Sequence, residues 1–280
     1  MKLHNKHQAA FLAIQLAASA SLFIYFDVFK KHLLEFFLVY FAVHCVGGTV
    51  FYHRYLSHKS FKISNWGYFF CLFASFWGLY GSPVSWSAIH RQHHRHTDTV
   101  RDPHSPFFKS IFDVQLFSFL AKPNFRYVKD LLEVPSLVFV HRYYFLLHGF
   151  LSVVLLLISW EVFLYAYLWP AFFTWHFASL TNSVCHVWGY RNFSVADKSR
   201  NNPIIAFLTF GEGWHNNHHA RPRRPSFREK WWELDPGAWI IQVIEAKSNR
   251  STTHSEKASS LGPASGGHQV SSTAAATTEL

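Results

Sequence analysis

The hydrophobic positions of this chain gather into long runs separated by short polar turns. Residues 9–29 and 33–52 are two such runs, and residues 143–159 and 162–184 are two more. Each is close to the roughly 20 residues that a helix needs to cross the hydrocarbon core of a bilayer. The pattern predicts an all-α membrane protein with four transmembrane helices. We expect the first to be retained, because it is too long for the apolar part of a signal peptide.

Composition and charge support a membrane location. Half of the 280 residues are apolar, 19% are aromatic and only 15% are charged. The net charge of +10 comes largely from Lys and Arg in loops beside His-rich segments, which by the positive-inside rule places those loops and both termini in the cytoplasm. Residues 246–280, rich in Ser, Thr, Ala and Gly, predict a disordered tail after one membrane domain of residues 1–245. No motif for binding nucleic acid is present, and three scattered Cys predict neither a disulfide framework nor an iron–sulfur site.

Histidine is concentrated near the ends of the predicted spans. The pattern H-x-x-H-H occurs twice, at His90 and again at His215. On a helix these positions share one face, so we expect each copy to point three imidazoles at one metal. His53 and His58 are separated by five residues, a spacing that turns about 140° on an α-helix, so we expect the helix to end or unwind there. Asn182 and His186 are one turn apart on the fourth span.

Residues 65–89 decide whether these histidines can meet. The segment is apolar, but Gly78, Gly81 and Pro83 interrupt its second half. A crossing here places the histidines that follow it on the opposite membrane face from His53 and His58. Since a shared metal centre forbids that, we predict a re-entrant or interfacial helix. Residues 105–142 mix Phe-rich pieces with Lys and Arg, as an amphipathic surface segment does.

Two metal ions with histidine ligands follow from these clusters. Carboxylates are sparse among them, which disfavours Mg²⁺ and Ca²⁺, whereas two redox-active irons fit a nitrogen-rich set with an open position. Asp98 and Asp102 are candidates to orient imidazoles. Closed zinc sites that stabilise loops are the alternative. The predicted ligands are His53, His58, His90, His93, His94, His186, His215, His218 and His219. His96 and His104 are offset from the triplets, and His44, His148 and His176 within the spans are interpreted as structural.

The motifs HRYLSH, HRQHH with the following TDTVRDPHSP, NSVCHVWGY and GEGWHNNHH closely resemble the membrane fatty-acyl desaturases of the stearoyl-CoA (delta-9) type, especially short bacterial members, over residues 33–245. The resemblance implies four spans with a cytosolic cap, and a di-iron centre held by the nine histidines, with Asn182 reaching one iron through water. It also implies use of O2 and two external electrons to make a cis double bond, and a substrate tunnel closed near Phe41 and Cys45.

The chain departs from the family in two places. Animal members carry an Arg-Asp pair just before the HRQHH motif that helps hold CoA, whereas this chain has Ala88 and Ile89 there. An acyl chain on a phospholipid or on acyl carrier protein is therefore an alternative to acyl-CoA as the substrate. No cytochrome b5 domain is fused, so a separate cytochrome b5, ferredoxin or rubredoxin-like donor must dock, in a bacterial inner membrane or an ER membrane. The alternatives are a membrane di-iron hydroxylase and, remotely, a metal transporter or sensor.

Overall fold

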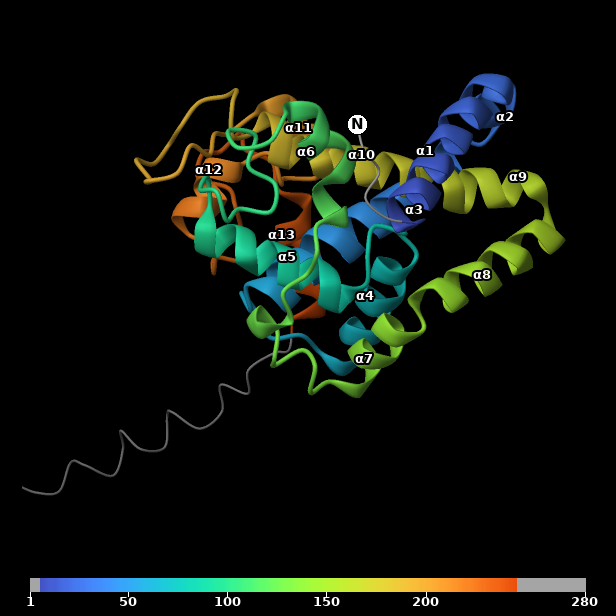
Figure 1. The fold of residues 1–280 in the computed structure, drawn as a ribbon, viewed down its shortest axis with the longest axis horizontal. Coiled ribbons are helices and arrows are strands. Elements are labelled where there is room, and N and C mark those ends of the chain that lie inside the picture. Colours follow the sequence, from blue (N-terminus) through green and yellow to red (C-terminus); the bar gives the residue numbers. More distant parts are fainter. Residues whose placement is uncertain (1–5, 246–280) are drawn as a thin grey trace, which may run out of the picture. The chain divides into compact units, whose positions relative to one another are not determined.

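The computed structural model describes residues 6–245, and within this range the regular structure is entirely helical (Figure 1). The only β-structure among these residues consists of isolated bridges, such as the one between Tyr190 and Asn201. The predicted all-α class is therefore confirmed for this part of the chain. The predicted disordered tail lies outside the described residues.

The first two predicted spans form helices of different character. α1 (Lys6–Ile24) and α2 (Phe26–Lys31) cover the first span with a break at Tyr25. α3 (Leu33–Tyr40) runs directly into the π-helix η1 (Phe41–Ser57), so the second helix continues beyond its predicted end at residue 52. Such long π-helical stretches are rare, and single π turns are frequent at functional sites.

Residues 65–89 fold into two helices rather than one. α4 (Asn65–Phe76) and α5 (Pro83–His96) are joined by a turn in which Gly81 has a φ of 107°. α4 packs against η1 at Gly47, where an added Cβ would lie 2.5 Å from the Cα of Ser75. With 12 residues, α4 is about 18 Å long, which is shorter than the ~30 Å hydrocarbon core. Its re-entrant placement in a membrane stays a prediction.

The main apolar core lies between η1, α4 and α5. Val50 and Phe51 from η1, Leu72 from α4 and Val84 from α5 are buried in one cluster. Full burial of such a side chain contributes roughly 1.5–3 kcal/mol. This core packs η1 against α4 and the first turn of α5, and both η1 and α5 carry histidines further along the chain.

The predicted surface segment and the last two spans come next in the chain. The segment between residues 105 and 142 contains α6 (Ile111–Phe117), the 3₁₀ turns η2 (Ser118–Leu120) and η3 (Phe125–Tyr127), and α7 (Pro135–Arg142). α8 (Tyr144–Ile158) is bent by 70° from α7. The fourth predicted span is built from α9 (Trp160–Phe163), the π turn η4 (Leu164–Leu168) and α10 (Trp169–Val184). Pro170 lies in the first turn of α10, directly after η4, within an uninterrupted helical run from Trp160 to Val184.

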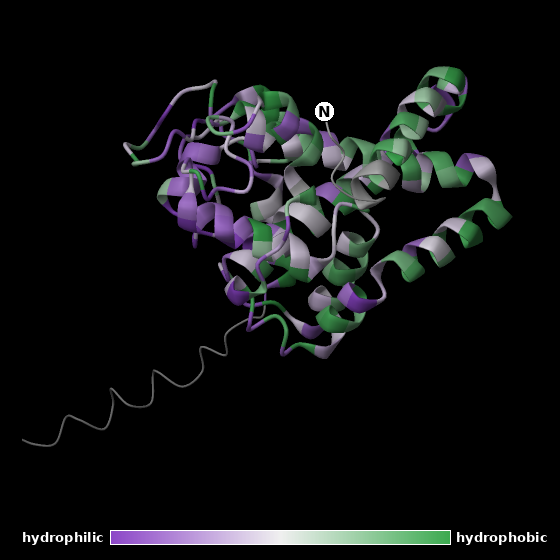
Figure 2. Cartoon of the chain, viewed as in Figure 1, coloured by the Kyte–Doolittle hydropathy of each residue, from purple (hydrophilic) through white to green (hydrophobic). Residues whose placement is uncertain are grey.

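Three short helices complete the fold: α11 (Pro203–Leu208), α12 (His215–Ala220) and α13 (Pro236–Ile244). Hydrophilic residues gather on α5, α12 and the loops beside them, whereas α1 and α8 are mostly hydrophobic (Figure 2). This separation matches a polar cap at one end of apolar helices.

By length and composition, one helix in the described range is able to cross a membrane alone. It is the continuous helix Leu33–Ser57, and the bent pair α7 and α8 adds a second if it counts as one span. Large apolar side chains on α8 are nevertheless exposed, with Phe150 70% and Leu157 82% accessible. Exposed apolar surface of this kind fits contact with lipid. The four-span topology remains a prediction beyond the one or two helices that pass this test.

Candidate metal centre

All nine predicted ligands meet in two adjacent groups. The ligand atoms within each group lie within 4.8 Å of one another. The first group has five members, His53, His58, His90, His94 and His218, and the second has four, His93, His186, His215 and His219. Segments separated by more than a hundred residues thus converge on one polar end of the fold.

The π-helix η1 explains how His53 and His58 reach the same group. His58 follows the last residue of η1, and its N–H donates to the carbonyl of His53 at 3.2 Å. An i→i+5 bond places residue i+5 one turn above residue i. The expectation that the helix ends or unwinds here agrees with the structure, because the wider π-helical winding, which ends at Ser57, brings both histidines onto one face, with ring centroids 5.1 Å apart.

Each H-x-x-H-H triplet is divided between the two groups. On α5, His90 and His94 join the five-membered group while His93 joins the other. On α12, His215 and His219 join the four-membered group, while His218 joins the five-membered group. The expectation of three imidazoles per spot was wrong for a geometrical reason. At 100° per residue, positions i and i+4 differ by only 40°, whereas i+3 lies 100° from i+4.

Four carboxylates orient four of the imidazoles through their Nδ1 atoms. The Nδ1–H of His93 donates to both oxygens of Asp102 at 3.0 Å, and that of His186 donates to Asp98 at 3.1 Å. This agrees with the roles predicted for the two aspartates. His219 donates in the same way to Asp197 at 3.1 Å, and His53 forms a very short contact with Glu212. A proton held at Nδ1 leaves the Nε2 lone pair free to bind a metal.

Asp197 and Glu212 were missed by the sequence analysis. Asp197 lies in the loop between α10 and α11, far from the histidine motifs in sequence. Glu212 stands three residues before His215, and its position in GEGW was the available signal. Both are recognisable only once the chain is folded, because their partners come from other elements.

The Nε2 atoms of histidines from different segments lie close to one another. Nε2 of His93 lies 3.4 Å from Nε2 of His219, and both rings carry their proton on Nδ1. The Nε2 atoms of His186 and His215 are 3.0 Å apart, and those of His58 and His90 are 2.9 Å apart. With the Nδ1–H groups of His93 and His219 directed at Asp102 and Asp197, the Nε2 lone pairs of these two rings face each other, and they repel unless a cation lies between them.

These separations match those of ligands around one ion. With metal–nitrogen bonds of about 2.1 Å, ligands at right angles are about 3.0 Å apart and tetrahedral ligands about 3.4 Å apart. Burial lowers the pKa of His90, His94 and His218 well below the usual value for histidine, which keeps these imidazoles neutral. Neutral imidazole is the form that binds a metal. The residues therefore fit a two-metal centre.

The second H-x-x-H-H motif, His215-Asn216-Asn217-His218-His219, is held in place by its two asparagines. Asn217 accepts hydrogen bonds from the side chains of Asn192 and Asn201 and donates to Glu233 at 2.9 Å. Asn216 accepts from the N–H groups of Asn192 and Phe193. The N-N pair in HNNHH thus anchors α12 to the surrounding loops, a role that the sequence analysis did not assign.

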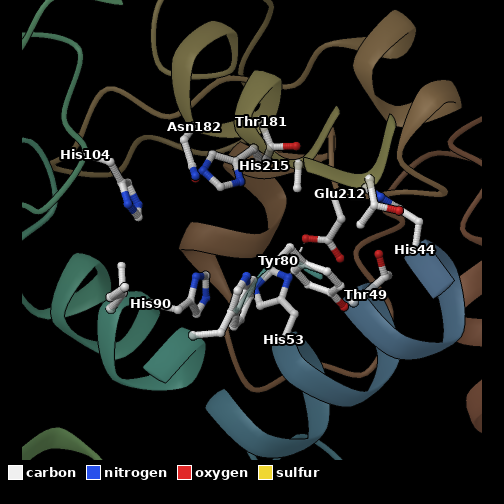
Figure 3. A pocket seen from close by; sticks show the side chains of 15 residues that line it. His44, Thr49, His53, Tyr80, His90, His104, Thr181, Asn182, Glu212 and His215 are labelled. Carbon is white, nitrogen blue, oxygen red and sulfur yellow. Dashed lines mark hydrogen bonds and ion pairs between the residues drawn. The ribbon is translucent and has the colours of Figure 1, made fainter. Parts of the chain in front are cut away.

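A small cavity of 40 Å³ lies beside the histidines (Figure 3). His104 and Asn182 line it together with Thr181 and Tyr80. Within the described part of the chain, both ring nitrogens of His104, Thr181 Oγ1 and Tyr80 Oη have no hydrogen-bond partner. Unsatisfied buried polar atoms cost roughly 1–3 kcal/mol each, so they indicate that the cavity holds water or another polar molecule.

His104 has a more specific place than the sequence indicated. It is buried, stacks on His93 with ring centroids 4.5 Å apart, and groups with His93 and Asp102. His96, by contrast, bonds to the hydroxyl of Tyr127. Asn182 lies in the cavity wall near His215 (Figure 3), which is compatible with a contact through water.

The two predicted tunnel residues have different surroundings. Phe41 lines a larger apolar groove and packs on Phe210 with centroids 5.0 Å apart. Cys45 is fully buried in a cluster with Phe36 and Trp169, and it is absent from the described walls of both the cavity and the groove. The winding of η1 separates the two residues, since i and i+4 are not one turn apart in a π-helix.

Comparison with known proteins agrees with this geometry. Residues 32–253 match the fatty acid desaturase family. The sn-2 palmitoyl-lipid 9-desaturase of Nostoc sp. is 34% identical over 71% of this chain and 73% of its own length. The delta-9 acyl-lipid desaturase 1 of Arabidopsis thaliana is 34% identical over 81% of this chain and 79% of its own length. The acyl-CoA C20 delta5-desaturase of Anemone leveillei is 36% identical over 75% and 70%. The chain therefore belongs to the fatty acid desaturase family and is an oxidoreductase that desaturates acyl chains.

Proposed function

We propose that this desaturase holds two irons with its nine histidines, and that it uses O2 and two external electrons to place a cis double bond at the delta-9 position of a saturated acyl chain. The observation that carries the proposal is the convergence of the nine histidines in two groups of five and four, with ring nitrogens that lie within 4.8 Å of one another in each group. Overall, the saturated chain, O2, two electrons and two protons give the unsaturated chain and two waters.

Iron fits the donor set better than zinc. Structural zinc sites are closed and four-coordinate and generally include Cys, whereas one group here offers five imidazoles and neither contains Cys. The bound irons would supply the oxidising power that no side chain has. The protein's own part is to orient the imidazoles through Asp98, Asp102, Asp197 and Glu212, and to keep Asn182 facing the cavity.

The topology proposed for this reaction has four spans at residues 9–29, 33–52, 143–159 and 162–184, with residues 65–89 re-entrant. The histidines, both termini and the cap then lie on the cytoplasmic side. Support comes from the convergence of His53 and His90 at one end of the fold and from the apolar surface of α8. Membrane association agrees with the family, and the single helix Leu33–Ser57 satisfies the length requirement.

The proposed substrate is an acyl chain on a membrane lipid. Ala88 and Ile89 are buried and carry no charge for a CoA phosphate. The relatives from Nostoc and Arabidopsis are named as acyl-lipid 9-desaturases, whereas the one from Anemone is named as an acyl-CoA delta5-desaturase. The delta-9 position is taken from the first two.

The proposed electron donor is a separate acidic protein such as cytochrome b5, ferredoxin or a rubredoxin-like protein. A polar surface pocket of 510 Å³ is lined by His58 together with Lys59, Arg91 and Arg223. Lys59 and Arg91 also bind Asp130 at 2.9 and 2.7 Å. A positive surface that reaches a proposed iron ligand suits docking of an acidic partner.

Product analysis decides between this proposal and its rival. The chain is expressed in a host without desaturase, and the lipids are analysed by mass spectrometry with double-bond localisation. We expect a cis delta-9 product that is two mass units lighter than the substrate. A product heavier by one oxygen would indicate the hydroxylase, and an unchanged lipid pool with metal movement would indicate a transporter.

A further inference from the structure

An apolar groove of 710 Å³ lies on the flank of the protein, apart from the cavity beside the histidines. Its walls include Phe36 and Tyr40 from α3, Phe173 from α10 and Phe207 from α11. The volume is in the range of small-molecule binding sites, roughly 300–1,000 Å³. The proposed desaturation does not yet account for this groove.

One end of the groove has the features of a membrane interface. Trp232 and Trp239 line it and are 38% and 51% exposed, and Phe207 is 83% exposed. Tryptophan is enriched where a membrane meets water. Lys230 lies over the ring of Trp232 at 5.6 Å, which places a cation at this rim. The lining also includes Phe29 and Phe36, within the first two predicted spans.

Aromatic rings in contact with one another lie between the groove and the cavity. His44 lines the cavity, whereas Tyr40 and Phe210 line the groove. The ring centroid of His44 lies 5.3 Å from that of Tyr40 and 6.0 Å from that of Phe210. The groove and the cavity are thus separated by side chains and not by backbone at this point.

Phe210 is held in an unfavourable backbone conformation. Its φ is 53°, which is strained for a bulky residue. The hydroxyl of Tyr40 donates to the carbonyl of Leu208 at 2.5 Å and so ties this loop to α3. Strain of this kind costs of order 1–3 kcal/mol and clusters at ligand clamps and switch regions. Phe210 thus lies in a strained loop that leads into the second H-x-x-H-H motif, and relief of this strain would move its ring.

We propose that the groove binds the acyl tail of a membrane glycerolipid and is the lateral port through which a lipid-linked chain reaches the metal cavity, with Phe210 as the gate. The groove runs from interfacial tryptophans to residues of the predicted spans, so its occupant lies in the bilayer and not in water. Lys230 at the rim complements a lipid phosphate. This inference rests on the proposed function for its catalytic consequence, but not for the binding of lipid.

Photo-crosslinking tests the binding directly. The protein is reconstituted in phosphatidylcholine vesicles that contain a phosphatidylcholine with a diazirine on its acyl chain, and adducts are mapped by mass spectrometry. We expect adducts concentrated on α11 and residues 231–240. An even distribution over these segments and α8 would overturn the proposal. This readout needs neither iron nor turnover, so it separates failure of the port from failure of the desaturase proposal.

A covalent plug tests the route. The three native Cys are buried, so Phe207→Cys introduces an exposed thiol at the groove, and Phe150→Cys on α8 is the matched control. Each variant is treated with a bulky maleimide and compared with its own untreated form. We expect the plug at residue 207 to abolish groove adducts and desaturation of the phospholipid, and the control label to leave both unchanged. Equal desaturation by both labelled proteins would overturn the port.

The gate has its own test. Phe210→Ala removes the ring that separates groove from cavity, and the same diazirine lipid is used. We expect adducts to appear on α10 residues that line the cavity, such as Ala178 and Thr181. If the adducts stay confined to the groove as in the unaltered protein, Phe210 is not the gate.

Discussion

Replacement of Asp102 by Asn tests how the proposed centre is built. Both carboxylate oxygens accept from Nδ1–H of His93 at 3.0 Å, and the same carboxylate also accepts from the backbone N–H of Asp98 and His104. An amide presents one N–H₂ donor in place of an acceptor. His93 is then driven to carry its proton on Nε2, which removes the lone pair proposed to bind the metal.

The expected loss is confined to one metal. Loss of such an outer partner typically lowers metal affinity 10- to 100-fold, or about 1.4–2.7 kcal/mol. His93 belongs to the four-membered group, so the five-membered group should keep its affinity. At limiting free iron the variant should hold one iron per chain where the unaltered protein holds two.

The assay is equilibrium competition with a chelator, followed by metal analysis of the protein. Asp113→Asn is the matched control, because Asp113 is exposed on α6 and its side chain accepts a hydrogen bond from the hydroxyl of Ser110, the local helix cap. If Asp102→Asn binds both irons as tightly as the control, the orienting role of this carboxylate is refuted.

Three further predictions concern the protein around the centre. Arg54 is fully buried and binds both oxygens of Asp235 at 2.8 and 3.1 Å. Arg54→Leu should therefore lower the free energy of unfolding by about 3–5 kcal/mol, measured by thermal denaturation in detergent. A smaller loss in the double variant with Asp235→Asn would confirm that the unpaired charge is the cause. Phe41→Ala should extend the range of accepted acyl chains, because Phe41 lines the groove; identical product profiles in gas chromatography would contradict this. Burial raises the pKa of Asp130, but hydrogen bonds from Arg91 and Lys59 outweigh it and lower the pKa to about 2. Its stabilising contribution is therefore present above the unfolded pKa of about 3.9 and is lost as the pH falls towards 2, so the melting temperatures of the unaltered protein and Asp130→Asn should converge on acidification.

The histidine ligands were predictable because their spacing is local. H-x-x-H-H places several imidazoles on one side of a helix whatever the rest of the chain does. Their partition was not predictable, since it depends on α5 and α12 facing each other across the centre. For His53 and His58 the spacing showed that an α-helix does not continue, but it did not show that the chain winds as a π-helix there.

The carboxylates that contact the histidines were likewise predictable only in part. Asp98 and Asp102 were predicted because they follow the α5 histidines closely; Asp102 does partner His93, nine residues earlier, but Asp98 partners His186, 88 residues later. Asp197 and Glu212 partner His219 and His53 across long stretches of sequence, which no local pattern encodes. The close approach of η1 and α4 at Gly47 is likewise a tertiary contact and was not foreseen.

The central claim is that two irons are bound by two histidine groups that each draw on several distant segments. The most direct measurement is metal content per chain in the purified protein and in two variants, His94→Ala from the five-membered group and His215→Ala from the four-membered group. The account predicts two irons in the unaltered protein, with desaturation lost in both variants and at least one iron lost from each. Zinc in place of iron, a single iron in the unaltered protein, or two irons retained in both variants would contradict it.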